Sequence, residues 1–248
     1  MIPFRYIIFS LKIDKKNRGH NMDAFKIAAA CDHTLLRQDS ALHEILTHCD
    51  EAIEYGAASV CIPPCFVEDA AKYVGDRIRI CTVIGFPNGY NKTSIKAFEA
   101  CEAVKDGAEE LDMVINIGLL KDKKYDALLE DIKAVRAACE GKILKVIIET
   151  CLLNEEEKIK MCEIVTLSGA DYIKTSTGFA GGGATLGDVT LFRKHIGEGV
   201  EIKVSGGVSS LEATEMFLSL GASRIGSSKI IKLLKEGESN EALGSVGY

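Results

Sequence analysis

The sequence lacks the features of several protein classes. No stretch approaches the ~20 consecutive apolar residues that a membrane-spanning helix requires. The apolar start, MIPFRYIIFSLKI, is short, contains Arg5 and has no small-residue cleavage site, so we expect neither a membrane span nor a secretory signal. Positive charge is not in excess, because 30 Lys and Arg stand against 36 Asp and Glu. The net charge of -6 argues against sequence-independent binding to nucleic acid or to an anionic membrane.

Metal-binding and redox cysteine motifs are also missing. The chain has nine cysteines, but no two of them have the CxxC spacing of zinc or dithiol sites. Most lie within apolar runs, as Cys31 does in KIAAACDHTL and Cys81 does in RIRICTVIG, which is typical of buried free thiols. An odd number of cysteines without a secretory signal indicates a reducing compartment, and we predict a cytoplasmic protein.

Short apolar segments alternate with longer amphipathic ones along the chain. The short segments are apolar on both faces, which favours strands of a parallel sheet covered by helices. Eight such strands, each followed by a helix, favour a closed (β/α)₈ barrel, and 248 residues suit that fold. The predicted strands are KIAAACDHT, ASVCIPP, RIRICTVIG, EELDMVINIG, ILKVIIET, DYIKTST, VEIKVSGG and SRIGSS.

The predicted helices have recognisable ends. Ser40, Asn154 and Ser210 are placed to cap the start of a helix, and glycines follow the last turns. A Gly-Ala pair recurs between a helix and the next strand in YGAASV, DGAEEL, SGADYI and LGASRI. We therefore expect one barrel domain over residues 23–248 with a short C-terminal tail. Residues 1–22 are interpreted as an N-terminal extension, either disordered or reflecting an alternative start.

Three lysines lie inside apolar runs on three consecutive predicted strands: Lys145, Lys174 and Lys203. Lysine is rarely buried without a partner. Ion pairs with Asp112 and Glu149, or lysines that reach outward to solvent, would be a purely structural explanation. The functional alternative is imine chemistry at the carboxyl ends of the strands, where barrel enzymes place their active sites.

Imine formation needs an amine without its proton. An ordinary lysine pKa of ~10.4 leaves well under ~1% of the amine neutral at pH 7. A second ammonium nearby and a dry pocket both disfavour the charged form, so neighbouring buried lysines fit a nucleophile and the cation that tunes it. An acid such as Asp112 can then transfer protons.

Glycine-rich segments follow the last three predicted strands, in STGFAGGGAT, SGGVSSLEA and RIGSSKI. In barrels the loops after strands seven and eight commonly bind phosphate through backbone N–H groups and helix N-termini. These loops therefore predict a phosphate site.

The sequence resembles the deoxyribose-phosphate aldolase family from about Asp23 to the C-terminus. The resemblance implies a class I aldolase that cleaves 2-deoxyribose 5-phosphate to glyceraldehyde 3-phosphate and acetaldehyde through a lysine Schiff base, in deoxyribose phosphate catabolism. The matching segments cover every predicted strand in order: DHTLL, VCIPPCFV, VIGFPNG, ELDMVINIG, LKVIIETCLL, ADYIKTSTGF, IKVSGGV and IGSS.

The resemblance also assigns roles to residues. Lys174 matches the imine lysine, Lys203 the lysine that tunes it, and Asp112 the residue that gives and takes the proton. Asp32 and Lys145 match the pair that supports the proton relay. The family's mobile tail ends in tyrosine, as this chain does at Tyr248, and the alternative for Tyr248 is a disordered tip. The residues that match the family's phosphate-binding backbone are Gly178, Gly206, Gly207, Gly226 and Ser227.

One position departs from the family pattern. A basic residue often follows SGGV or SGGI, whereas this chain has Ser209. We expect phosphate binding to depend more on backbone amides or on Lys229.

Other functions remain as alternatives. Another Schiff-base barrel, such as a transaldolase or a sugar-bisphosphate aldolase, would need room for a hydroxymethyl group. A non-catalytic phosphate-binding barrel would form no imine. A metal-dependent aldolase is disfavoured because the predicted strand ends lack a histidine cluster, and His33 is interpreted as a packing and hydrogen-bonding residue. We expect no cofactor, no metal, a sugar phosphate and an aldehyde as ligands, and by analogy a homodimer.

Overall fold

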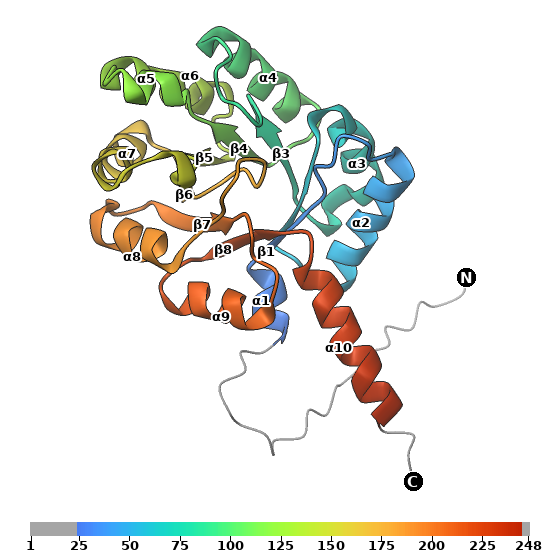
Figure 1. Ribbon diagram of the computed structural model, residues 1–248. Coiled ribbons are helices and arrows are strands. Elements are labelled where there is room, and N and C mark those ends of the chain that lie inside the picture. The colour runs from blue at the N-terminus through green and yellow to red at the C-terminus, as the bar shows by residue number, and fades with distance from the viewer. Residues whose placement is uncertain (1–23, 245–248) are drawn as a thin grey trace.

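The computed structural model describes residues 24–244, with side chains as far as residue 237. Eight parallel strands form a closed barrel in which each strand pairs with the next and β8 pairs with β1, and the helices surround it (Figure 1). The predicted (β/α)₈ barrel is confirmed. The strands are β1 Cys31–Thr34, β2 Ser59–Ile62, β3 Ile80–Ile84, β4 Glu110–Val114, β5 Ile143–Ile147, β6 Tyr172–Lys174, β7 Glu201–Ser205 and β8 Arg224–Ser227.

Ten α-helices lie in the described part of the chain. They are α1 Ala24–Ala29, α2 Leu42–Glu54, α3 Val67–Val74, α4 Thr93–Lys105, α5 Ile117–Lys121, α6 Tyr125–Ala138, α7 Glu155–Ser168, α8 Leu186–His195, α9 Leu211–Ser219 and α10 Ile230–Gly244. None of these helices has the length and apolar character needed to cross a membrane.

Alternation along the strands separates two environments. Val146, Ile173 and Ile202 face outward into the hydrophobic core between the barrel and the helices. Their neighbours Lys145 and Lys203 point inward, because successive side chains of a strand point to opposite faces. The inside of the barrel therefore receives the charged residues, and the apolar core lies outside it.

Helix ends follow the local sequence in most places. Asn154 accepts a hydrogen bond from the backbone of Glu157 at the start of α7, and Gly169 ends that helix with φ 75°. Ser210 caps α9 in the same way. The prediction for Ser40 is wrong, because Ala41 occupies the capping position and the Glu44 carboxylate accepts its N–H at 2.9 Å.

Other differences concern the first strand and the shorter helices. The segment KIAAACDHT is a strand only over Cys31–Thr34, and α1 precedes it. Short apolar runs are ambiguous between helix and strand, and alanine favours the helix. The helices α3, α5 and α10 were not among the predicted helices either. Residues 1–22 and Tyr248 lie outside the described residues, so the predictions for the extension and for the tyrosine tail stay predictions.

Candidate active site

Asp112 is the centre of a buried cluster inside the barrel. Register pairs Asp112 on β4 with Lys145 on β5, and Lys174 on β6 with Lys203 on β7. The Asp112 Oδ2 atom accepts hydrogen bonds from Lys174 Nζ at 2.7 Å and from Lys203 Nζ at 2.5 Å. Its Oδ1 atom lies 2.9 Å from Lys145 Nζ. One carboxylate thus contacts all three lysines that the sequence singled out.

Asp32 at β1 joins this cluster from the other side of the barrel. Its Oδ2 atom accepts a hydrogen bond from Lys203 Nζ and lies 3.4 Å from Lys145 Nζ. Its Oδ1 atom accepts hydrogen bonds from Ser59 Oγ at 2.7 Å and from Arg224 Nη1 at 2.5 Å. The structure therefore brings together five of the six residues for which a catalytic role was predicted, and Tyr248 is the one outside the described residues.

Two charged residues of this cluster, Glu110 on β4 and Arg224 on β8, were not predicted from the sequence. Glu110 lies two residues before Asp112 on β4, and its Oε2 atom is 2.6 Å from Lys145 Nζ and 2.8 Å from Arg224 Nη1. The sequence could have indicated Glu110, because a spacing of two residues puts its side chain on the same inward face of the strand as Asp112. Glu110 and Arg224, each the first residue of its strand, form a layer beneath the candidate catalytic residues.

The charges of the cluster nearly balance. Three carboxylates face four basic groups: Asp32, Glu110 and Asp112 against Lys145, Lys174, Lys203 and Arg224. Buried charges are expensive unless they are compensated. The ion pairs between these oppositely charged groups compensate the cost of holding so many charges inside the barrel.

Lys145 and Lys203 are ammonium groups in the folded protein. Burial by itself would lower their pKa, but the nearby carboxylates of Asp112 and Asp32 outweigh it and raise the pKa of both above the usual value. Burial would raise the pKa of Asp112, and its three lysine neighbours lower it well below the usual range. The pKa of Asp32 is lowered by Lys145, Lys203 and Arg224 against the effect of burial. Asp112 and Asp32 are thus carboxylates held between ammonium groups.

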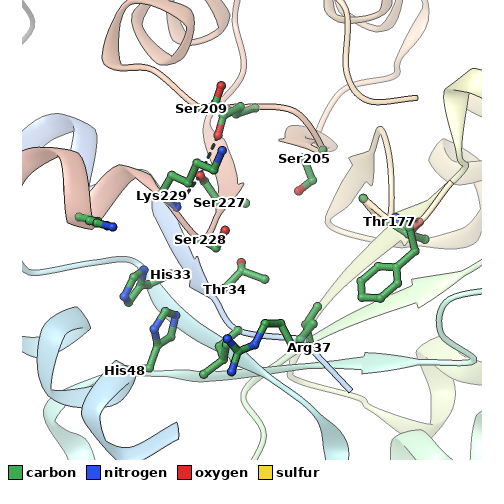
Figure 2. A pocket seen from close by; sticks show the side chains of 18 of the residues that line it. His33, Thr34, Arg37, His48, Thr177, Ser205, Ser209, Ser227, Ser228 and Lys229 are labelled. Atoms are coloured by element: carbon green, nitrogen blue, oxygen red, sulfur yellow. Dashed lines mark hydrogen bonds between the residues drawn. The ribbon is translucent and has the colours of Figure 1, made fainter. Parts of the chain in front are cut away.

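A cavity of about 750 Å³ opens above the cluster at the carboxyl ends of the strands. Lys174 is among its lining residues, whereas Lys145 and Lys203 are fully buried beneath it. Figure 2 shows Ser227, Ser228 and Lys229 facing Thr177 across this cavity, with His33 and His48 along another side. Of the three lysines, Lys174 is the one that a molecule in the cavity can reach.

All five residues predicted to bind phosphate line the same cavity. Gly178, Gly206 and Gly207 have φ of 85°, 81° and 77°, the left-handed region that favours glycine. Gly226 has no room for a side chain, because a Cβ atom there would lie 2.3 Å from Ser205 Oγ. Backbone N–H groups can therefore approach a ligand closely along this wall.

A hydrogen bond of Ser227 connects the loop after β8 to the loop after β7. Ser227 Oγ donates to the Val208 carbonyl at 2.9 Å and accepts from the Lys229 N–H at 3.1 Å. Ser209 and Lys229 both line the cavity, so a basic residue is available near the serine that departs from the family pattern. The helices α9 and α10 begin directly after these loops.

Glu149 was considered as an ion-pair partner of the buried lysines, but its contacts are different. It pairs with none of the three lysines; its Oε2 atom accepts from the Thr177 N–H at 3.1 Å and from Thr177 Oγ1. Thr177 Oγ1 in turn accepts from the Phe179 N–H at 3.0 Å. Glu149 thus fixes the loop that carries Gly178. Its sequence position did not reveal this contact, because the two loops meet only in the closed barrel.

His33 of β1 packs against a second histidine, which comes from helix α2 and not from a strand. His48 on α2 stacks on His33 of β1, with 3.4 Å between ring centroids, and His33 Nε2 lies 3.2 Å from Glu51 Oε2. Burial lowers the pKa of His33 to about 4 and that of His48 to about 3, so both rings are neutral at pH 7. No sequence pattern indicated this pairing, because His48 on helix α2 comes next to His33 only in the folded chain.

All nine cysteines are free thiols, as expected. Six are buried, and three are exposed: Cys65, Cys101 and Cys151. Cys81 belongs to the cluster, with its Sγ atom 3.3 Å from Asp112 Oδ1 and 3.2 Å from Lys145 Nζ. Burial and the neighbouring Asp112 carboxylate raise its pKa well above the usual value, so it is an unreactive thiol.

Comparisons with known proteins agree with this geometry. Residues 21–224 match the family described as DeoC/LacD family aldolase. The chain is 51% identical to a deoxyribose-phosphate aldolase of Clostridioides difficile, over 87% of this chain and 98% of that protein. It is also 51% identical to a deoxyribose-phosphate aldolase of Streptococcus pyogenes, over 92% of this chain and all of that one.

Solved structures give the same result. An aldolase named QR15 superposes with a TM-score of 0.83 and 39% identity, over 88% of this chain and 98% of that one. The deoxyribose-phosphate aldolase of Aeropyrum pernix, described as tetrameric, has a TM-score of 0.81 and 26% identity, over 88% of this chain and 93% of that one. The chain belongs to the DeoC/LacD family of aldolases.

Proposed function

We propose that this protein is a deoxyribose-phosphate aldolase of class I, in which Lys174 forms the Schiff base. The observation that carries the proposal is the position of Lys174: it lines the cavity and contacts Asp112, whereas Lys145 and Lys203 lie buried beneath. Relatives about 51% identical over nearly the whole chain carry this activity in their names. The direct test is release of acetaldehyde and glyceraldehyde 3-phosphate from 2-deoxyribose 5-phosphate by the purified protein.

The reaction follows from this arrangement. The Lys174 amine attacks C1 of the open-chain sugar, and loss of water gives a protonated imine. Removal of the C3 hydroxyl proton then breaks the C2–C3 bond, glyceraldehyde 3-phosphate leaves, and the bonding electrons form an enamine on Lys174. Protonation of the enamine carbon restores the imine, and water hydrolyses it to acetaldehyde and free Lys174. The imine nitrogen is the electron sink throughout.

Asp112 is the group that moves the protons in this proposal. It is the carboxylate within hydrogen-bond distance of Lys174 Nζ, and general acid–base catalysis requires such contact. Lys145 and Asp32 continue the hydrogen-bonded chain below it. Lys203 holds Asp112 and Asp32 in place and adds a positive charge beside Lys174.

The substrate's phosphate is assigned to the loops after β6, β7 and β8, at Gly178, Gly206, Gly207, Gly226 and Ser227. This wall combines left-handed glycines with the N-termini of α9 and α10, and such a wall suits a phosphate. A sugar phosphate and an aldehyde are therefore the proposed ligands. The homodimer expected from the sequence stays a prediction.

Substitution of Gly207 by aspartate tests the phosphate assignment. A Cβ atom at Gly207 meets no other atom within 4 Å, so the carboxylate would extend into the cavity, where it repels a phosphate. We expect kcat/KM for 2-deoxyribose 5-phosphate to fall roughly 100-fold or more, about 3 kcal/mol, with a much smaller loss for unphosphorylated 2-deoxyribose.

Gly207→Ala is the control, because it introduces the same strain at φ 77° without the charge. Steady-state kinetics of both variants on both sugars measure the effect. Equal losses on the two sugars with Gly207→Asp would place the phosphate elsewhere.

Chelation tests the class of the aldolase. Because the protonated imine accepts the electrons, cleavage needs no Lewis acid. We expect the initial rate of cleavage to be unchanged after extensive dialysis against EDTA. A loss of activity that Zn²⁺ or Mn²⁺ restores would instead assign the protein to the metal-dependent aldolases.

A further inference from the structure

The cavity has a wall that the proposed reaction does not use. It is formed by His33 of β1 and by His48 and Glu51 on α2, which all line the cavity. Figure 2 shows the two histidines on this wall. His48 and Glu51 are three residues apart, so they lie on one face of the helix. The two imidazoles and the carboxylate therefore meet from two rigid elements.

The donor atoms of this wall are already close together. Glu51 Oε2 lies 3.2 Å from His33 Nε2 and 4.0 Å from His48 Nδ1, and one ligand atom from each residue fits within 4.8 Å. A tetrahedral zinc ion with bonds of ~2.0–2.1 Å holds its ligand atoms about 3.3–3.4 Å apart. The His33–Glu51 pair matches that spacing, and a rotation of the His48 ring would bring its nitrogen to the ion.

The rings also have unused hydrogen-bonding capacity. His33 Nδ1 and His48 Nε2 are buried and have no hydrogen-bond partner among the described residues. The nitrogens that lie nearest the Glu51 carboxylate are the other two, His33 Nε2 and His48 Nδ1, and these are the ring atoms available to an ion. On the carboxylate, Lys235 Nζ lies 3.5 Å from Oε1 and leaves Oε2 to the histidines.

We propose that His33, His48 and Glu51 bind a divalent transition-metal ion of the Zn²⁺ type in the wall of the substrate cavity. Two imidazoles and one carboxylate are a ligand set that zinc uses, and imidazole suits zinc, copper, iron and nickel, whereas magnesium and calcium prefer oxygen ligands. The ion takes the place of the proton shared by His33 and Glu51. Three protein ligands leave a fourth position for water on the cavity side. The site takes no part in imine formation and does not depend on the proposed function.

Cobalt(II) is the probe, because its absorption spectrum distinguishes binding at this site from binding to any of the nine cysteines. The full-length protein, reduced and freed of metal, is titrated with Co²⁺ and followed by visible absorption. We expect one Co²⁺ per chain, with the d–d bands of a four-coordinate nitrogen and oxygen site and no thiolate charge-transfer band. Addition of Zn²⁺ should abolish the bands by displacement.

Two variants test the ligands, and one serves as the matched control. His48→Gln and Glu51→Gln should weaken Co²⁺ binding by at least roughly 10–100-fold, because even outer-shell partners of metal ligands contribute that much. His43→Gln should bind as the unmodified chain does, since His43 lies on the same helix and lines the same cavity but is outside the cluster. Circular dichroism checks that each variant is folded.

The proposal is overturned if no saturable Co²⁺ spectrum develops. It is also overturned if the spectrum carries the thiolate band, or if it survives both glutamine substitutions in folded protein. None of these results would affect the assignment of Lys174, because metal binding is measured without substrate.

Discussion

Replacement of Lys174 by methionine should abolish aldol cleavage, with a loss of kcat of roughly 10⁴-fold or more, because the covalent intermediate can no longer form. The variant should still fold. Asp112 keeps its ion pairs with Lys145 and Lys203, and methionine fills the space of the lysine stem. The measurement is the single-turnover rate of acetaldehyde release from 2-deoxyribose 5-phosphate.

Trapping of the intermediate locates the nucleophile. Borohydride reduction in the presence of acetaldehyde should leave an ethyl group on one lysine, and peptide mapping should find it on Lys174. The Lys174→Met protein should take up no label at a barrel lysine. Lys229 is an internal control, because it lines the same cavity without contacting Asp112. A label on Lys203 or Lys145 would reverse the assignment.

Replacement of Lys203 by methionine should move the pH profile of imine formation toward alkaline pH. Lys174 Nζ and Lys203 Nζ share one oxygen of Asp112, so they are within about 5 Å of each other. Two like charges at that distance repel by roughly 3 kcal/mol at an effective dielectric constant of about 20, which corresponds to about two pH units.

The sign follows from the charge that is removed. In the folded protein Lys203 is an ammonium, since Asp112 and Asp32 outweigh burial and raise its pKa. Its positive charge lies beside the Lys174 nitrogen and repels any other positive charge there. Without that repulsion, imine formation, which needs an uncharged amine, requires a higher pH. The midpoint should therefore rise by about two pH units, with a large loss of rate at pH 7.

The same variant should lose stability, because removal of one partner from a buried ion pair costs about 3–5 kcal/mol. Asp32 retains Arg224 and Asp112 retains Lys145, which limits the loss. Thermal unfolding is therefore recorded beside the pH profile of borohydride trapping. Lys229→Met serves as the matched control, and its pH profile should not move. If Lys203→Met kept its profile and instead lost preference for the phosphorylated sugar, Lys203 would be a phosphate ligand.

Much of the fold follows from the sequence because barrel units are local. The run ILKVIIET is apolar on both faces, and the capping residue Asn154 and the glycine Gly169 mark the two ends of α7. Such signals need only a few neighbouring residues. They fail where a run is short and rich in alanine, as in AFKIAA, which is the helix α1.

The candidate catalytic residues also follow from the sequence, for a simple geometric reason. In a closed parallel barrel the carboxyl ends of all strands meet, so polar residues at those ends are brought together. The sequence placed Lys174, Lys203 and Asp112 at strand ends, and the resemblance gave them roles. It could not show which lysine a substrate reaches.

The tertiary structure decided which of the three lysines lines the cavity. Lys174 does, whereas Lys203 and Lys145 are fully buried beneath it. The partners Glu110 and Arg224, the Glu149–Thr177 contact and the stacking of His48 on His33 were likewise settled only in three dimensions. Local sequence determines which side chains point inward and where strands end; the closure of the barrel and the return of each helix determine which of those side chains meet.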